Sequence, residues 1–433
     1  MSTRIVLAVL LGLCVARNVG AFQFGACTHL ALKRGNATQV LSLMAAGGFD
    51  SFRDDAFWGA IESQPGELRF PGKYDELRTA IAGAAKRGQS PMVVLAYGNR
   101  HYDGGGLVVS RTAIAAYANY AGFVARELKG QVRQFEIWNE WNSGFGSKPK
   151  VSRGDAQAYV RMLKSAAAAI HDANPEAEVI GGVTAGVDLK WIRELIAAGG
   201  LDHLDAISVH SYTLFRRETN PEGAVASLDK LHALLEGAEP QRRIPVYVTE
   251  IGWPTNKGKH GVEEREAAMY LARFTLLART RPWIGGVWWY DLIDDGDSDT
   301  QAEQRFGLVR RSLAPKPALR MARSVGALLQ SKDLHRAYRF PAGGYLVTGT
   351  DAAGRWAIGW TMSEQFLSWE GGSTREPDVP AEYAALASRL ATDGYPLLFR
   401  RVNGMWQRDA HWFEGSKPRP TAPDVRVSER GPA

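Results

Sequence analysis

Short apolar runs alternate along the chain with longer segments that mix Ala, Leu and charged residues. Continuous apolar runs are typical of parallel strands, because such strands are buried on both faces. The longer segments, among them 111–128, 156–172 and 263–280, have the length and composition of helices. Eight strands that alternate with helices predict an α/β fold, the (β/α)8 TIM barrel. The predicted strands are 22–28, 49–53, 92–97, 132–138, 178–183, 206–210, 246–249 and 284–290.

The sequence changes character after the predicted last helix of the barrel, 318–330. Residues 343–360 have the pattern of two strands around a turn, and 381–390 that of one short helix. We therefore expect a small C-terminal β-rich domain, which either binds carbohydrate or only buttresses the barrel. The predicted division is a signal peptide over 1–21, the barrel over 22–333, the β-rich accessory domain over 334–415 and a disordered tail over 416–433.

The N-terminus carries the features of a secretory signal. Arg4 precedes an apolar run over 5–16 that is too short to span a bilayer comfortably, and small residues stand just before Phe22. We predict cleavage before Phe22 and no stable membrane insertion afterwards; an uncleaved anchor is the alternative. Cleavage leaves Cys27 as the only cysteine, so an internal disulfide is excluded. Secretion without disulfides fits a bacterial periplasm or exterior.

Charge and motifs narrow the class of ligand. The net charge of +6 is dispersed, without the basic run that nucleic acid binding demands, so no nucleic acid partner is expected. No His/Cys cluster, P-loop or dinucleotide fingerprint is present, so neither a cofactor nor a metal is predicted. The acidic loop from Asp294 to Asp299 permits a calcium site, but solvated carboxylates explain it better. The oligomeric state stays open.

Two glutamates follow predicted strands about a hundred residues apart. Glu140 comes just after 132–138 and Glu250 just after 246–249, both among Trp, Ile and Val residues. Burying a carboxylate is costly, so both positions need a functional reason. The strand C-termini of a TIM barrel meet at one face, where its chemistry lies. Two carboxylates there predict cleavage of a glycosidic bond, in which one protonates the leaving oxygen and the other attacks the sugar or activates water.

Three polar residues near other strand ends are expected to support Glu250. Arg53 ends the second strand, and its positive charge would keep Glu250 ionised. A salt bridge from Arg53 to one of the next two aspartates is the alternative. Tyr212 follows the sixth strand and is placed to donate its hydroxyl to Glu250, and His210 is placed to support the same network.

Further residues are candidates for contact with the sugar itself. Asn99 follows the third strand. Trp289 is the predicted platform under the cleaved sugar, although strand alternation aims only one of Trp288 and Trp289 inward. Glu136 shares a strand with Glu140 and is expected to pack as a structural acid. The thirteen Trp of the chain suit a sugar ligand, because aromatic planes bind the flat C–H faces of sugar rings.

The segments Ile-Trp-Asn-Glu ending at Glu140 and Val-Thr-Glu-Ile-Gly around Glu250 resemble the two catalytic motifs of clan A glycoside hydrolases. With residues 52–58, they resemble glycoside hydrolase family 39 in the broad sense, particularly its periplasmic PslG-type branch that cuts bacterial exopolysaccharide. The resemblance implies that Glu140 is the general acid/base, Glu250 the nucleophile and Asn139 a ligand of the neighbouring hydroxyl. It also implies retention of configuration, with the carboxyls about 5 Å apart. An acid/base is expected to hold its proton in apolar or negatively charged surroundings.

The sequence as a whole predicts a retaining glycoside hydrolase that acts by double displacement. We expect endo-cleavage of a bacterial exopolysaccharide, with a polysaccharide or oligosaccharide as the substrate. An exo-acting β-glycosidase of the xylosidase kind is the alternative among enzymes. A barrel that binds glycans without cleaving them is the alternative of another class, and the presence of both Glu140 and Glu250 argues against it.

Overall fold

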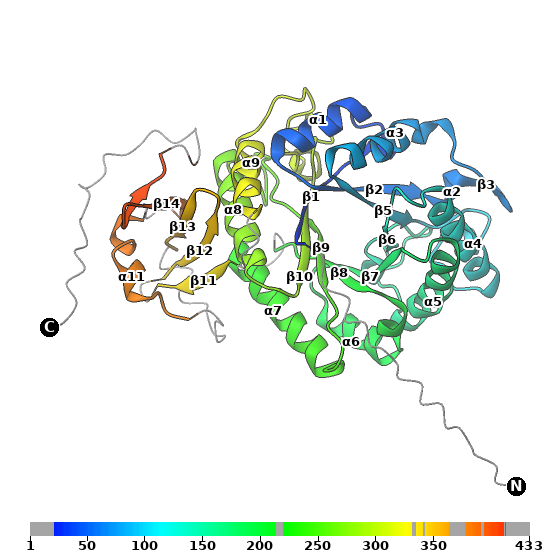
Figure 1. Cartoon of the computed structure of the whole chain (residues 1–433). Helices are drawn as coiled ribbons and strands as arrows, with labels where there is room; N and C mark the ends of the chain where they lie inside the picture. The colour runs from blue at the N-terminus through cyan, green and yellow to red at the C-terminus, as the bar shows by residue number, and fades with distance from the viewer. Residues whose placement is uncertain are drawn as a thin grey trace, which may run out of the picture.

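Eight parallel strands close into a barrel in the order β1-β10-β9-β8-β7-β6-β5-β2, which confirms the predicted TIM barrel (Figure 1). The computed structural model describes residues 21–213, 220–330, 335–340, 343–362, 377–390, 394–410 and 412. The predicted tail, and the predicted signal peptide up to residue 20, lie outside these residues. The barrel strands are β1 (Gln23–Cys27), β2 (Ser51–Phe57), β5 (Ser90–Ala96), β6 (Gln134–Ile137), β7 (Glu178–Ala185), β8 (Ala206–His210), β9 (Val246–Ile251) and β10 (Ile284–Trp289).

Helices cover the outside of the barrel (Figure 1). Several begin at a polar side chain that accepts a hydrogen bond from a free backbone N–H of the first turn, as at Asn36, Ser110, Asp155 and Asn220. In the described part of the chain, no helix is both long and apolar enough to cross a membrane. The covering helices are α1 (Ala37–Gly47), α3 (Asp75–Ala84), α4 (Arg111–Glu127), α5 (Ala156–Ala173), α6 (Leu189–Ala197), α7 (Pro221–Ala238), α8 (Glu264–Arg279) and α9 (Pro317–Leu329).

Large side chains fill the barrel interior toward the N-terminal ends of the strands. Trp288 is fully buried there, packs edge-on against Tyr247, and donates from Nε1 to Ser51 Oγ at 2.9 Å. Cys27 and Met92 belong to the same cluster. We call this cluster the barrel floor. Polar groups gather at the opposite end of the barrel, at the C-terminal ends of the strands, as is usual in TIM barrels.

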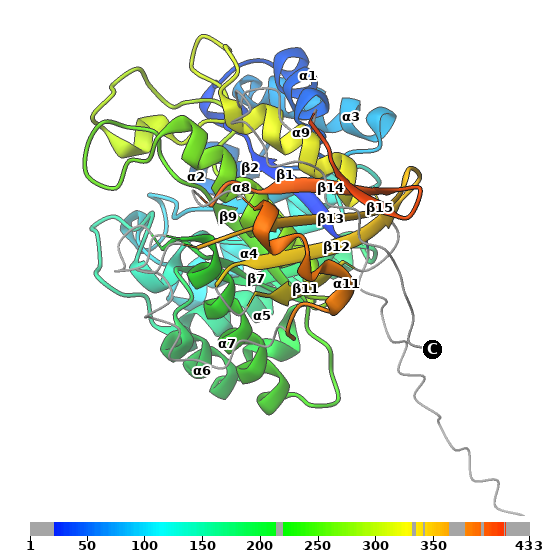
Figure 2. The same ribbon diagram turned by 90° about the vertical axis from the view of Figure 1, so that its left-hand side faces the viewer.

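A short excursion after β2 and an antiparallel sheet after α9 complete the fold. The sheet has the order β11-β12-β13-β14-β15, which confirms the predicted β-rich region, and Figure 2 shows it face on. The helix predicted over 381–390 is a single α-turn followed by a 3-10 turn. The remaining elements are α2 (Trp58–Ile61), β3 (Glu62–Gln64), β4 (Glu67–Leu68), β11 (Arg336–Arg339), β12 (Tyr345–Asp351), β13 (Gly354–Trp360), α11 (Ala381–Ala384), the turn Ala387–Arg389, β14 (Leu397–Val402) and β15 (Met405–Arg408).

The C-terminal sheet docks on α7 and α8 through a buried polar contact. Trp360 at the end of β13 donates from Nε1 to Glu222 Oε1 of α7 at 2.9 Å. Arg273 of α8 holds the same carboxylate with Nε at 2.8 Å and Nη2 at 2.5 Å. All three side chains are buried, so the sheet and the barrel share one core. The predicted domain limits near 334 and 415 stay predictions.

This buried ion pair gives a prediction about stability. Glu222→Ala should lower the free energy of unfolding by about 3–5 kcal/mol, because it leaves the Arg273 guanidinium buried without a counter-charge. Replacing both residues by Met should recover most of that loss, since no unpaired charge remains. Denaturant unfolding measures both effects. Asp299→Ala, which breaks only the exposed pair with Lys257, is the control and should leave the midpoint unchanged. Equal stabilities of Glu222→Ala and the control would contradict this account.

Candidate active site

Glu140 and Glu250 face each other at the C-terminal end of the barrel. Glu140 follows β6 and Glu250 lies in β9, and one carboxylate oxygen of each, together with Nδ1 of His210, lies within 4.8 Å of the others. The two side chains are 19% and 11% exposed, so they are largely desolvated but open to a ligand. The upper limit of 4.8 Å is compatible with the predicted separation of about 5 Å. We call Glu140 and Glu250 the carboxylate pair.

Arg53 connects three polar groups around this pair. It donates from Nη1 to Glu250 Oε1 at 2.7 Å, from Nε to Glu136 Oε2 at 2.6 Å, and from Nη2 to Asn139 Oδ1 at 2.9 Å. The predicted contact with Glu250 is therefore present. Of the two aspartates that were the alternative partners, Asp54 instead accepts from backbone N–H groups of the loop after β1. Glu136 is fully buried and packs as the expected structural acid.

His210 and Tyr212 reach the pair from the end of β8. The Tyr212 hydroxyl donates to Glu250 Oε2 at 3.1 Å, as predicted. His210 Nδ1 lies 2.9 Å from Glu140 Oε1 and 3.4 Å from Glu250 Oε2, so one imidazole touches both carboxylates. The register places His210 directly beside Glu250 on the neighbouring strand. Both residues therefore stand where the sequence predicted them.

The electrostatics of Glu140 differ from the expectation for an acid that keeps its proton. Burial alone favours a neutral Glu140, but the hydrogen bond and the charge of His210 outweigh it and lower the pKa of Glu140. Burial likewise opposes a charged His210, yet Glu250 and Glu140 raise the pKa of His210. In the absence of sugar, this contact therefore favours the charged forms of both Glu140 and His210.

The backbone around Glu140 adopts unusual angles. Trp138 and Glu140 have φ values of 69° and 52°, in the left-handed region that residues other than glycine rarely occupy. Trp138 Nε1 donates to the Phe145 carbonyl at 3.1 Å, and the Glu140 N–H donates to the Val183 carbonyl at 2.9 Å. Backbone held this way concentrates at functional sites, because the surroundings must stabilise it.

Two predicted sugar contacts are wrong. Trp289 is 2% exposed and points outward to α8, where its Nε1 lies 3.2 Å from Thr275 Oγ1. The residue that turns inward is Trp288, which belongs to the barrel floor. Asn99 is buried too, and its side chain bonds the backbone of Glu62 and His101, so it braces loops instead of facing the pair.

Three further residues beside the pair were not predicted from the sequence. Two positions after the inward Trp288, Tyr290 lies partly exposed against Tyr212 with ring centroids 6.4 Å apart. Two positions after Arg53, Asp55 is also partly exposed. Tyr97 follows β5, and burial, then the charges of Asp55 and Glu250, raise its pKa. Strand alternation counted from Trp288 and Arg53 would have found Tyr290 and Asp55.

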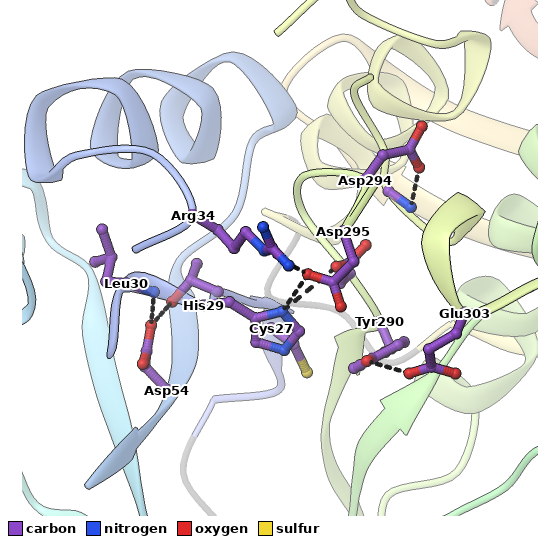
Figure 3. Close-up of polar contacts among 12 residues, drawn as sticks. Cys27, His29, Leu30, Arg34, Asp54, Tyr290, Asp294, Asp295 and Glu303 are labelled. Carbon is purple, nitrogen blue, oxygen red and sulfur yellow. Dashed lines mark hydrogen bonds and ion pairs between the residues drawn. The ribbon is translucent and has the colours of Figure 1, made fainter. Parts of the chain in front are cut away.

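A second polar group lies at the ends of β1 and β10 (Figure 3). His29 Nδ1 lies 3.2 Å from Asp295 Oδ1 and 3.6 Å from Asp291 Oδ2, and Arg34 Nε lies 3.0 Å from Asp295 Oδ1. Burial opposes a charged His29, but the hydrogen bond with Asp295 and the charge of Asp291 prevail and raise the pKa of His29 to about 10.

Two groups among the described residues have the spacing to hold a metal ion: Glu140, His210 and Glu250, and His29 with Asp291 and Asp295. In both, neighbouring carboxylates raise the pKa of the imidazole, so a metal would compete with a proton for that histidine. In the acidic loop, Asp294 pairs with Lys316 at 2.6 Å, so only the outer part of the loop is solvated as expected.

Solved structures of glycoside hydrolases are similar to this chain. A family 39 glycoside hydrolase from Bacteroides cellulosilyticus WH2 aligns with a TM-score of 0.69 and 23% identity over 90% of this chain and 79% of its own. A monomeric β-xylosidase from Caulobacter crescentus CB15 aligns with a TM-score of 0.58 and 15% identity, over 83% and 76%. GH5_18 from Streptomyces cattleya, in complex with GlcNAc, aligns with a TM-score of 0.58 and 18% identity over 74% of this chain and 84% of its own. At these identities, the likeness establishes the fold. No protein-family model matches the chain, and a comparison with curated proteins finds no match.

The contact between His210 and the pair gives a prediction about protonation. His210→Gln removes the imidazolium charge and keeps much of the side-chain volume, so the pKa of Glu140 should rise. Titration of the ¹³C-labelled glutamate carboxyls by NMR measures this change. Tyr212→Phe is the control, because it removes a hydroxyl that bonds only Glu250, and it should leave the Glu140 titration in place. An unchanged or lower Glu140 pKa in His210→Gln would show that His210 does not set it.

Proposed function

We propose that this protein is a retaining glycoside hydrolase that cleaves O-glycosyl bonds by double displacement. The observation that carries the proposal is the carboxylate pair, whose oxygens approach within 4.8 Å at the C-terminal end of a TIM barrel. Retaining enzymes hold their two carboxyls about 5–5.5 Å apart, whereas inverting enzymes need roughly 6.5–9.5 Å to admit a water molecule. The similarity to solved glycoside hydrolases supports the same class of reaction.

In this mechanism Glu250 is the nucleophile and Glu140 the acid/base. Arg53 and Tyr212 hold the two oxygens of Glu250 and stabilise its charge until it attacks the anomeric carbon. As the glycosidic C–O bond breaks, a protonated Glu140 gives its proton to the leaving oxygen. Glu140 then takes a proton from water, which attacks the glycosyl ester and releases Glu250. Because His210 lowers the pKa of Glu140, the first step requires that Glu140 carries a proton in the complex with the sugar.

For the substrate, we propose endo-cleavage of a bacterial exopolysaccharide. Tyr97 beside the pair contacts two further aromatic rings, with ring centroids 6.0 Å apart from Phe57 to Tyr97 and 5.6 Å apart from Tyr97 to Phe145. Phe145 is 47% exposed, which suits contact with a second or third sugar ring. The family 39 resemblance of the catalytic motifs supports the same reading. An exo-acting β-glycosidase is the second candidate, since one of the similar structures is a β-xylosidase.

We propose that the protein acts in the periplasm or outside the cell of a bacterium. The support is the signal peptide predicted from the sequence over 1–21, together with the single cysteine of the mature chain. Periplasmic fractionation of cells that express the full chain, with N-terminal sequencing of the product, tests both the location and the cleavage before Phe22.

The test of the reaction is turnover of a polysaccharide panel by wild type and variants. Glu250→Gln should abolish turnover, because an amide cannot form the glycosyl ester. Glu140→Gln should cost about 10²–10⁴-fold on natural glycans, whose leaving groups need a proton, and less on an activated aryl glycoside. NMR of the first-formed product should show retained anomeric configuration, and mass spectrometry of the products separates endo-cleavage into oligosaccharides from exo-release of single sugars.

Glu236→Gln is the matched control for these variants. It makes the same change from acid to amide on α7, where the side chain is 62% exposed, and should leave turnover unchanged. Inverted product configuration, or full activity of either pair variant, would contradict the proposed mechanism. A protein that binds glycans but turns over none would instead support the non-catalytic alternative.

A further inference from the structure

Asp55 presents a free carboxylate beside the pair. On β2, the side chains of Ser51 and Arg53 point into the barrel, where they meet Trp288 and Glu250, so the alternation of the strand also points Asp55 inward. Asp55 is partly exposed, and within the described part of the chain its carboxylate has no hydrogen-bond or ion-pair partner. Both of its oxygens are therefore available to accept hydrogen bonds from a ligand.

A second carboxylate on the same side of the pair is incompletely satisfied. Asp291 follows β10 and is 2% exposed, and among the described residues its Oδ1 has no hydrogen-bond partner. Its other oxygen lies 3.6 Å from His29 Nδ1. A buried polar atom without a partner is costly, so an unfilled acceptor here indicates a place for a donor group.

Three of the cations on this side, His29, Arg34 and Arg53, already contact carboxylates. His29 and Arg34 both contact the Asp295 carboxylate, as Figure 3 shows, and Arg53 is shared between Glu136 and Glu250. The Tyr290 hydroxyl donates to Glu303 Oε1 at 2.8 Å, which adds a further acid to this side of the pair. Carboxylates therefore outnumber the cationic side chains around the site. The acids are Asp54, Asp55, Glu136, Glu140, Glu250, Asp291, Asp295 and Glu303, and the cations are His29, Arg34, Arg53, Lys73 and His210.

We propose that the ends of β1, β2 and β10 form a sugar subsite that accepts a ring without an acidic group, and that Asp55 accepts hydrogen bonds from its hydroxyls. This inference rests on the proposed function, because it takes the ligand of the pair to be a glycan. Sugar hydroxyls are donors that match free carboxylate oxygens, whereas a uronate, sulfate or phosphate would meet like charge in a partly desolvated place.

The electrostatics of Asp55 agree with this role. Burial, and then the neighbouring charge of Asp54, raise the pKa of Asp55 to about 6. The folded protein therefore destabilises the negative charge of Asp55, and a hydroxyl donor from a sugar would relieve that cost. For the same reason, the neutral variant Asp55→Asn should fold well, which makes it a usable probe.

The experiment compares matched sugars that differ only at C6, which carries either a neutral hydroxymethyl group or a carboxylate. The full-length protein is titrated calorimetrically with cellohexaose and β-1,4-mannohexaose, and with the same hexaoses oxidised at C6 to uronates. Wild type should bind at least one neutral hexaose about tenfold more tightly than its oxidised form, which corresponds to a modest repulsion between like charges. Equal or tighter binding of the oxidised forms would overturn the proposal.

Variants assign the preference to Asp55. In Asp55→Asn, the ratio of the affinity for the neutral hexaose to the affinity for its oxidised form should fall by about threefold or more. The reason is that one of the carboxylates that repel the uronate is gone. Asp297→Asn is the matched control: its side chain is 83% exposed on the loop after β10, and the ratio should stay at the wild-type value. A ratio in Asp55→Asn equal to that of the control would also overturn the proposal.

Turnover measured in the same samples keeps the two proposals separate. A neutral hexaose that is bound with the expected preference but never cleaved, even after prolonged incubation, would contradict the glycosidase and support the subsite. Cleavage of neutral and oxidised hexaoses at equal kcat/KM would support the glycosidase and contradict the subsite.

Discussion

The Arg53 guanidinium is the group on which the polar end of the barrel depends. It donates to Glu136, Asn139 and Glu250 from three different nitrogens, and so ties β2 to the residues of β6 and β9. Without it, the fully buried Glu136 carboxylate would lack a counter-charge, at a cost of several kcal/mol. A planar guanidinium that cannot lose its proton fixes the direction of its partners as well as their charge. The orientation of Glu250 is therefore a consequence of the barrel register.

The second constraint is the contact of the His210 imidazole with both carboxylates. The imidazole touches both members of the carboxylate pair and compensates two negative charges that would otherwise repel each other. Arg53 stabilises Glu250 from the side of β2, while His210 joins Glu250 to Glu140 from β8. The left-handed backbone at Glu140 is held by the same crowded surroundings. Charge, strand register and backbone conformation thus support one arrangement of the two acids.

The barrel and the pair could be predicted from the sequence because each depends on a local signal. Buried parallel strands appear as apolar runs, and Glu140 and Glu250 interrupt such surroundings with a charge. The direction of a side chain at a strand end has no comparable signal when both faces are apolar. Trp289 was for this reason mistaken for the inward residue, whereas Tyr290 faces the pair. The effect of His210 on Glu140 depends on a distance between β6 and β8, which no sequence pattern encodes.

The central claim is that Glu250 attacks the sugar within a pair built for retention. Mechanism-based labelling tests it most directly: wild-type protein is incubated with a set of 2-deoxy-2-fluoro glycosyl fluorides, digested, and mapped by tandem mass spectrometry. Because the fluorine slows release of the ester, the account predicts one glycosyl group attached to Glu250. A glycosyl group on Glu140 would exchange the two roles. Turnover without any covalent label, and with inverted products, would contradict the account.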